Sequence, residues 1–166
     1  ALPELHGRTV AAMAHCLDQV KAYDAAIVSY DYLIFHLPDD HPGAVQLTIQ
    51  RTIAQLFADQ LADADDALRR LRSTIERYRD SAIGASYRLA GLVQQVFTGH
   101  YADAVEESDN LIDELRPLGV EAGYGYALMA LSHHKIDSAD THLWWQRATL
   151  LMPPSSLIGR FDQLDP

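Results

Sequence analysis

Three histidines near the carboxyl end of the chain form the tightest group of residues that could hold a metal ion. His133 and His134 are adjacent, His142 follows, and Asp137 and Asp140 lie between them. Imidazole and carboxylate groups are common ligands of zinc and iron. Adjacent side chains on a helix point about 100° apart, so only one of the adjacent pair can face His142 across a turn. We therefore predict no metal site and no cofactor, and keep a metal-dependent hydrolase as a minor alternative.

The sequence motifs that mark common catalytic centres are missing. The chain contains no His-Glu-x-x-His motif, no Gly-x-Ser-x-Gly motif and no glycine-rich phosphate loop of the Walker type. The Glu-x-x-His pairs of di-iron bundles are also missing. Carboxylate pairs such as Glu106–Glu107 fall where polar helix faces are expected, and we interpret them as solvated. We therefore predict that the protein is not an enzyme.

Charge and cysteine content limit the partners and the compartment. Thirteen Lys and Arg against 23 Asp and Glu give a net charge of -10 over 166 residues, which repels phosphate backbones and predicts no direct binding of nucleic acid. The single Cys16 cannot form an internal disulfide, and no run of 18 apolar residues predicts a membrane span. We expect a cytoplasmic protein without membrane contact. Because the chain begins at Ala1 and not at Met, we also expect it to be a fragment of a longer one.

One helical pattern recurs four times along the chain. Between residues 23 and 38, apolar residues fall at steps 0, 1, 4, 7, 8 and 11, which is typical of one helix face. They are Ala26, Ile27, Tyr30, Leu33, Ile34 and Leu37. The same steps begin again at Ala67, Ala104 and Thr141, so the starting positions lie 41, 37 and 37 residues apart. Periods of roughly 20 to 50 residues are typical of stacked repeats.

Each of these helices is preceded by another apolar-periodic segment, which predicts four helical hairpins. We expect them at about residues 7–38, 43–79, 81–116 and 121–153. Pro42 suits a first helical position, Pro38 ends the helix before it, and Gly99 suits a left-handed turn. Lys21 and Ala22 are the expected turn of the first hairpin. The first helix of the fourth hairpin is apolar on nearly every side, which predicts burial on both sides or at an interface.

The second helix of the fourth hairpin is expected to pack through Trp145. Its opposite face then carries Leu143, Trp144, Leu150 and Leu151, which need cover. A short capping helix at about residues 156–164 is expected to supply that cover, since its apolar residues again follow steps 0, 1, 4 and 7 after a serine N-cap. The apolar area exceeds what a short helix covers, so self-association through the C-terminal hairpin is a further hypothesis.

These residues resemble the tetratricopeptide repeat, a helix-turn-helix unit of 34 residues. Residues 7–40 fit best. The family's eighth, seventeenth, twentieth, twenty-fourth and thirty-second positions are occupied there, in that order, by Ala14, Tyr23, Ala26, Tyr30 and Pro38. The later units match at Ala54, Ala67 and Leu71, then at Gly99, Tyr101 and Ala104, then at Ala148 and Pro153. Departures are Leu33 and Leu111 at small-residue positions, Arg79 and Arg116 in place of proline, and periods longer than 34. Long, degenerate repeats of this sort are similar to those of bacterial regulatory and scaffold proteins.

The resemblance implies an all-α fold of the α-α superhelix type. It consists of a right-handed stack of four antiparallel helical hairpins plus a short C-terminal capping helix. The whole is expected to form a single domain over residues 1–166. In such a stack the first helix of each hairpin faces a concave groove. The family's groove positions carry over to Arg8, His15, Asp18, Arg51, Gln55, Asp59, Arg88, Leu92, Gln95, Tyr126 and His134. Donors of this kind suit the main chain and carboxylates of a bound peptide.

We therefore predict a non-catalytic interaction module that binds a peptide or a partner helix in the groove. The alternative is a regulatory or sensor domain of a bacterial transcription regulator or signalling protein, in which the same surface contacts another domain or a small effector. The fold alone does not decide between them, because one fold hosts many sites.

Overall fold

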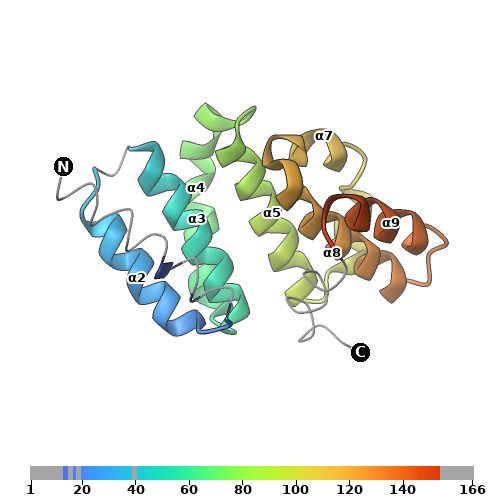
Figure 1. Ribbon diagram of the computed structural model, residues 1–166, viewed down its shortest axis with the longest axis horizontal. Helices are drawn as coiled ribbons and strands as arrows, with labels where there is room; N and C mark the ends of the chain where they lie inside the picture. The colour runs from blue at the N-terminus through green and yellow to red at the C-terminus, as the bar shows by residue number, and fades with distance from the viewer. Residues whose placement is uncertain (1–12, 15–16, 18–19, 39–40, 154–166) are drawn as a thin grey trace. The chain divides into compact units, whose positions relative to one another are not determined.

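The protein is seen here as a computed structural model, which describes residues 13–14, 17, 20–38 and 41–153 (Figure 1). All regular structure in these residues is helical, so the predicted all-α class is confirmed for them. The chain divides into two compact units, Ala1–Arg77 and Tyr78–Pro166, and the division falls two residues before the end of the second predicted hairpin. Among the described helices, none has both the length and the hydrophobicity needed to cross a bilayer. The predicted capping helix at 156–164 lies outside the described residues.

The first unit contains α2 (Tyr23–Phe35), α3 (Pro42–Phe57) and α4 (Leu61–Ile75), followed by the 3-10 turn η1 (Glu76–Tyr78). Helix α3 packs against both α2 and α4. Pro42 is the first residue of α3, as predicted, and His41 before it accepts a hydrogen bond from the Gly43 N–H at 3.0 Å. Small residues let the helices approach closely in a core formed by Ala14, Ala26, Ile27, Tyr30 and Ala54.

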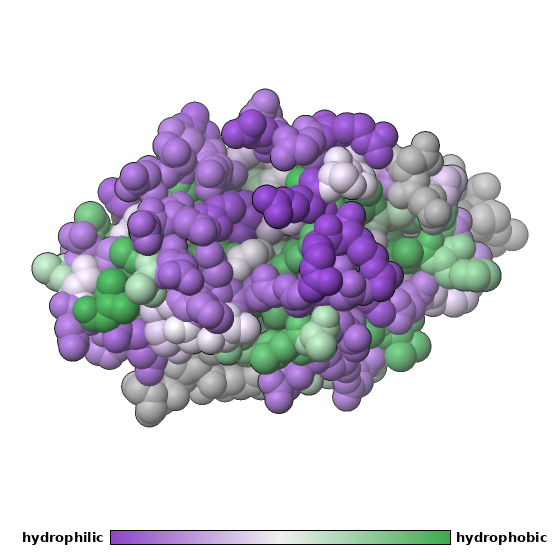
Figure 2. All heavy atoms as spheres, turned by 180° about the vertical axis from the view of Figure 1, so that it is seen from behind, coloured by the Kyte–Doolittle hydropathy of each residue, from purple (hydrophilic) through white to green (hydrophobic). Residues whose placement is uncertain are grey.

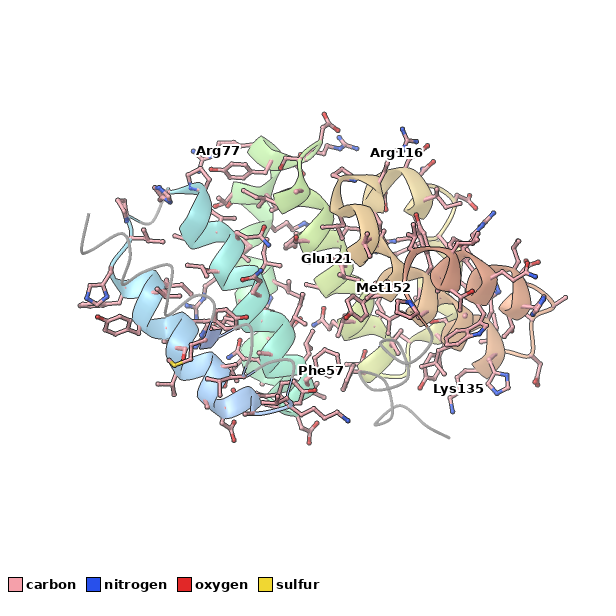
Figure 3. The ribbon with its side chains drawn as sticks, in the orientation of Figure 1. Phe57, Arg77, Arg116, Glu121, Lys135 and Met152 are labelled. Atoms are coloured by element: carbon pink, nitrogen blue, oxygen red, sulfur yellow. The ribbon has the colours of Figure 1, made fainter. Side chains whose placement is uncertain are left out.

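The second unit contains α5 (Ala82–Phe97), α6 (Tyr101–Glu106), α7 (Leu111–Leu115), the 3-10 turn η2 (Arg116–Glu121), α8 (Ala122–Lys135) and α9 (Thr141–Leu151). Helix α8 contacts α5, α6, η2 and α9, which explains why its sequence is apolar on nearly every side. Two glycines permit the close contacts of α8. A Cβ on Gly125 would lie 2.2 Å from Leu115 Cδ1, and one on Gly123 would lie 2.8 Å from the Cγ of Met152, which Figure 3 labels.

The same backbone turn recurs four times in the described part of the chain. Its central residue has a positive φ at Lys21 (61°), Asp59 (61°), Gly99 (76°) and Asp137 (55°), so the turns lie 38, 40 and 38 residues apart. In each turn, the residue that follows the positive-φ residue donates its N–H to the carbonyl of the residue five positions earlier than itself. These bonds are Ala22 to Leu17 at 2.8 Å, Gln60 to Gln55 at 2.9 Å, His100 to Gln95 at 2.8 Å and Ser138 to His133 at 2.9 Å. This is the Schellman motif, and it confirms the left-handed turn predicted at Gly99.

The predicted register of two second helices is wrong. In α4 the first inward residue is the fully buried Ala64, whereas Ala67 is only half-buried. In α9 Trp144 is buried and Trp145 is half-buried, the reverse of the prediction. A fully buried alanine follows the turn residue by five positions at Ala26, Ala64 and Ala104, whereas the first buried residue of α9, Trp144, follows Asp137 by seven. The spacing of apolar residues did not predict the inward face of either helix, because more than one set of residues three or four positions apart can form an apolar face.

The second helix of the third hairpin is broken, although the apolar steps predicted a continuous helix as far as Leu115. The chain leaves α6 at Glu107 and becomes helical again at Leu111. The Ser108 hydroxyl donates to the Val105 carbonyl at 2.6 Å. Ser, Asp and Asn side chains compete with the helix for backbone hydrogen bonds, and the sequence places all three at residues 108–110. Leu111 and Leu115 remain fully buried despite the break.

Candidate functional site

Eight of the eleven predicted groove residues lie in the described part of the chain. Arg8, His15 and Asp18 lie outside it. The eight are Arg51, Gln55 and Asp59 in the first unit and Arg88, Leu92, Gln95, Tyr126 and His134 in the second. Their surroundings differ enough to separate accessible polar groups from core residues.

In the first unit, Arg51 and Gln55 lie one turn apart on α3 and contact each other. Arg51 Nη1 donates to Gln55 Oε1 at 3.3 Å. Arg51 Nε lies 2.5 Å from Oδ1 of Asp31 on α2, an ion pair without the angle of a hydrogen bond. The Arg51 side chain is 26% exposed, whereas Gln55 is only 2% exposed. Arg51 is therefore the accessible member of the pair, and Asp59 is exposed at the turn that follows.

In the second unit, Arg88 and Gln95 of α5 bind the break between α6 and α7. Arg88 Nε donates to a carboxylate oxygen of Glu114 at 2.7 Å, and Arg88 Nη2 donates to the Glu107 carbonyl at 3.0 Å. Gln95 Nε2 donates to the Glu107 carboxylate at 2.9 Å. We call these four residues, Arg88, Gln95, Glu107 and Glu114, the α5 polar cluster. Arg88 is 22% exposed, and Gln95 Oε1 is buried without a hydrogen-bond partner.

Leu92 and Tyr126 belong to the core rather than to the accessible surface. Leu92 is fully buried, and Tyr126 packs against Trp144 with ring centroids 5.8 Å apart. Burial raises the pKa of the Tyr126 phenol, and the positive charges of Arg147 and Arg116 oppose that shift with smaller effects. Neither residue can touch a partner while the second unit keeps this packing.

The three histidines of the metal hypothesis do not come together. His133 is buried with its Nδ1 2.8 Å from Ser138 Oγ, whereas His134 is exposed. His142 Nε2 lies 2.9 Å from Gln146 Nε2 on the exposed part of α9. Within the described ranges, no three His, Cys, Asp or Glu side chains are grouped so as to hold a metal ion.

Sequence reasoning missed an aromatic cluster between α8 and α9. The His133 ring is stacked on Trp144 with centroids 6.2 Å apart, and Arg147 lies 4.7 Å from the centroid of the Trp144 ring. Tyr126 contacts the same tryptophan. Aligning the hairpins on their turn residues would not have found this cluster either, because Trp144 follows Asp137 by seven positions and not by five.

Helices α2 and α9 each expose several apolar side chains. Val28, Tyr32 and Phe35 recur at steps 0, 4 and 7 on the outer face of α2, and Phe35 is 85% exposed. On α9, three of the four residues for which cover was expected, Leu143, Leu150 and Leu151, are exposed, and Leu150 reaches 84%. Most of the surface in Figure 2 is hydrophilic, with hydrophobic residues gathered in small patches.

Comparison with family models, with curated proteins and with solved structures finds no match to this chain. The resemblance to the tetratricopeptide repeat therefore stays a prediction that depends on the residues quoted for it.

Proposed function

We propose that the chain is a non-catalytic helical-repeat module that binds a protein or peptide. The observation that carries this proposal is the repeated Schellman turn, which recurs at intervals of 38, 40 and 38 residues and closes a helical hairpin each time. Repeats of one hairpin favour side-by-side stacking, because each hairpin needs a neighbour to bury its apolar face. The arrangement we propose is the right-handed α-α superhelix of the tetratricopeptide type.

The binding groups that we propose are the accessible polar side chains on the first helices, considered in each unit by itself. Arg51 on α3 and Arg88 on α5 are partly exposed guanidinium groups, each already paired with a carboxylate of its own unit. Guanidinium groups bind carboxylates strongly and with defined geometry, so a peptide carboxylate can exchange with Asp31 or Glu114.

Binding is favoured over catalysis by how the polar side chains are used. Those on α3 and α5 contact each other and the neighbouring helices of their units. A hydrolase that used His133, His134 and His142 would need a different packing of the α8–α9 turn, because His133 is held in the core. No contact specifically favours the regulatory-domain alternative.

Selection of peptides followed by affinity measurement tests the proposal. A random twelve-residue phage library is selected on the full chain, and enriched peptides are measured by fluorescence anisotropy. We expect the double variant R51Q/R88Q to weaken binding by about tenfold or more, since each lost charged hydrogen bond is worth roughly 1.5 kcal/mol. Glutamine removes the charge without adding repulsion beside Asp31 and Glu114.

The matched control is R69Q/R72Q on the exposed side of α4, which removes the same charge away from the proposed surface. Its affinity should stay within about twofold of the wild type, as expected for solvated charges. Circular dichroism checks that both variants remain helical. Failure to enrich any peptide, or equal affinities for R51Q/R88Q and the wild type, would refute the proposal.

The superhelix is tested separately by small-angle X-ray scattering of the full chain. An open stack of hairpins should give a scattering curve with a longer maximum dimension than a compact bundle of the same length. A curve that fits a compact bundle would overturn the stacked arrangement and leave the peptide test unaffected.

A further inference from the structure

The fourth hairpin turn has a side-chain contact that adds to its backbone hydrogen bonds. The Ser138 N–H donates to the His133 carbonyl at 2.9 Å, and the Ser138 hydroxyl lies 2.8 Å from Nδ1 of the same histidine. The hydroxyl also accepts from the Asp140 N–H at 3.3 Å. The main chains and the side chains of His133 and Ser138 thus both close the turn. The turn follows Lys135, the last residue of α8, which is labelled in Figure 3.

The His133 ring is held in a place that suits only its neutral form. It is 5% exposed, and its Nε2 has no hydrogen-bond partner. The ring planes of His133 and Trp144 lie at 22° to each other. An imidazolium has two N–H donors, and here only the Nδ1 side has an acceptor. A proton on His133 would therefore leave a buried, charged donor unsatisfied, which is strongly unfavourable.

The charges near His133 do not compensate for this burial. The ionisable groups on elements packed against α8 are Tyr87 and Arg88 on α5, Tyr101, Asp103 and Glu106 on α6, Arg116 and Glu121 on η2, and His142 and Arg147 on α9. His134 and Lys135 follow on α8 itself, and Asp137 and Asp140 lie in the turn. Burial lowers the pKa of His133, and the Asp140 carboxylate opposes that shift with a smaller effect.

We propose that His133 and Ser138 form a proton-sensitive latch on the fourth hairpin. When the solution is acidified, His133 takes up a proton and leaves the face of Trp144. The contact with Ser138 is lost, and the turn between α8 and α9 opens. Opening exposes Trp144 and the side of α8 that α9 covers, so acid uncovers an apolar surface that is closed at neutral pH.

The direction of the pH effect follows from linkage. The pKa of His133 is lowered in the closed hairpin, so the open form binds the proton more readily. Above the ordinary histidine pKa of 6.5, His133 contributes its full stabilisation of the closed hairpin. This stabilisation is lost as the pH falls toward the lowered pKa of His133. Between these two values the opening equilibrium should rise by up to about tenfold for each pH unit.

Amide hydrogen exchange followed by NMR on the full chain tests the latch between pH 7.5 and 5.0. After correction for intrinsic exchange, the Ser138 amide should lose protection by up to about tenfold for each pH unit below about 6.5. The Gln60 amide makes the equivalent bond to Gln55 in the second turn, which contains no histidine, and should keep its protection. Equal behaviour of the two amides would overturn the latch.

Variants separate His133 from the other titrating groups. His133→Gln should abolish the pH dependence at Ser138, whereas His134→Gln, which removes the exposed neighbour, should leave it as in the wild type. If His133→Gln does not fold, NMR titration of the wild-type imidazole decides. A His133 pKa at or above 6.5, or protonation of His133 while the α9 amides stay protected, would refute the proposal.

Discussion

The second and fourth hairpins turn the chain in the same way but pack their second helices differently. Both turns contain an aspartate of positive φ, Asp59 or Asp137, and both carry the Schellman hydrogen bond. After the second turn, the small Ala64 packs inward and α4 presents a charged outer face. After the fourth, Trp144 packs inward and α9 exposes leucines.

The two hairpins thus share the turn and differ in the size of the residue that packs inward after it. The small Ala64 is completely buried after the second turn, as is Ala26 after the first. Tryptophan needs more room, and the fourth turn supplies two extra residues before α9 begins to pack. The larger side chain then meets the buried imidazole of His133 beside this turn.

Replacing Trp144 should have the largest effect on stability. Trp144→Ala should lower the free energy of unfolding by about 3–5 kcal/mol, the usual cost of emptying a buried aromatic site. Trp145→Ala should cost clearly less, because Trp145 is half-buried. Urea denaturation followed by circular dichroism measures both. A larger loss for Trp145 would restore the register predicted from the apolar steps.

Glycine substitution should distinguish the crowded α8 of the fourth hairpin from the α3 of the second. Gly125→Ala places a Cβ 2.2 Å from Cδ1 of the fully buried Leu115, and overpacking should cost about 1–3 kcal/mol. Gly43→Ala places its Cβ 2.9 Å from the exposed His41 side chain, which can move aside. The midpoint of thermal unfolding should therefore fall for the first variant and change little for the second; equal shifts would argue against the crowding of α8.

Changes at the turn residues should have similar effects in the two hairpins. Asp59→Gly and Asp137→Gly should each stabilise by up to about 1 kcal/mol, because glycine adopts the left-handed conformation without steric cost. The reverse change in the third turn, Gly99→Ala, should destabilise by about 1 kcal/mol. Chemical denaturation of the three variants gives the comparison. Opposite signs for the two aspartate variants would show that the turns are not equivalent.

The outer face of α4 should give the smallest effect. Asp65 pairs with Arg69 one turn later, and both side chains are largely exposed. Asp65→Asn should cost at most about 0.5 kcal/mol at low salt, and nothing measurable in 1 M salt, since solvated ion pairs are weak and screened. A loss that persists at high salt would assign the residue a role other than this ion pair.

Local signals in the sequence predicted the helical class and several boundaries. Pro42 at the start of α3 and Gly99 in the third turn fulfil the roles that their backbone preferences indicate. Register was harder to predict, because Ala64 and Ala67 lie three positions apart and both fit an apolar stripe. The break after α6 depends on the competition of short polar side chains for backbone groups, which apolar spacing does not register.

The candidate site was predictable in residue type and not in geometry. Arg51 and Arg88 were expected as polar groups on first helices, but their carboxylate partners, Asp31 and Glu114, are on other helices and distant in sequence. The burial of Leu92 and Tyr126 likewise depends on neighbours that a repeat pattern does not specify. The stacking of His133 on Trp144 follows from the longer fourth turn, and the pattern search did not include that length.

The left-handed position of the four turns is filled by lysine once, aspartate twice and glycine once, although the bend is the same. A turn that is defined by its backbone dihedral angles tolerates substitutions that would make a sequence motif unrecognisable. The similarity between the hairpins of this chain thus lies in the geometry and spacing of their turns. A turn sequence exchanged between two hairpins should therefore still reverse the chain direction.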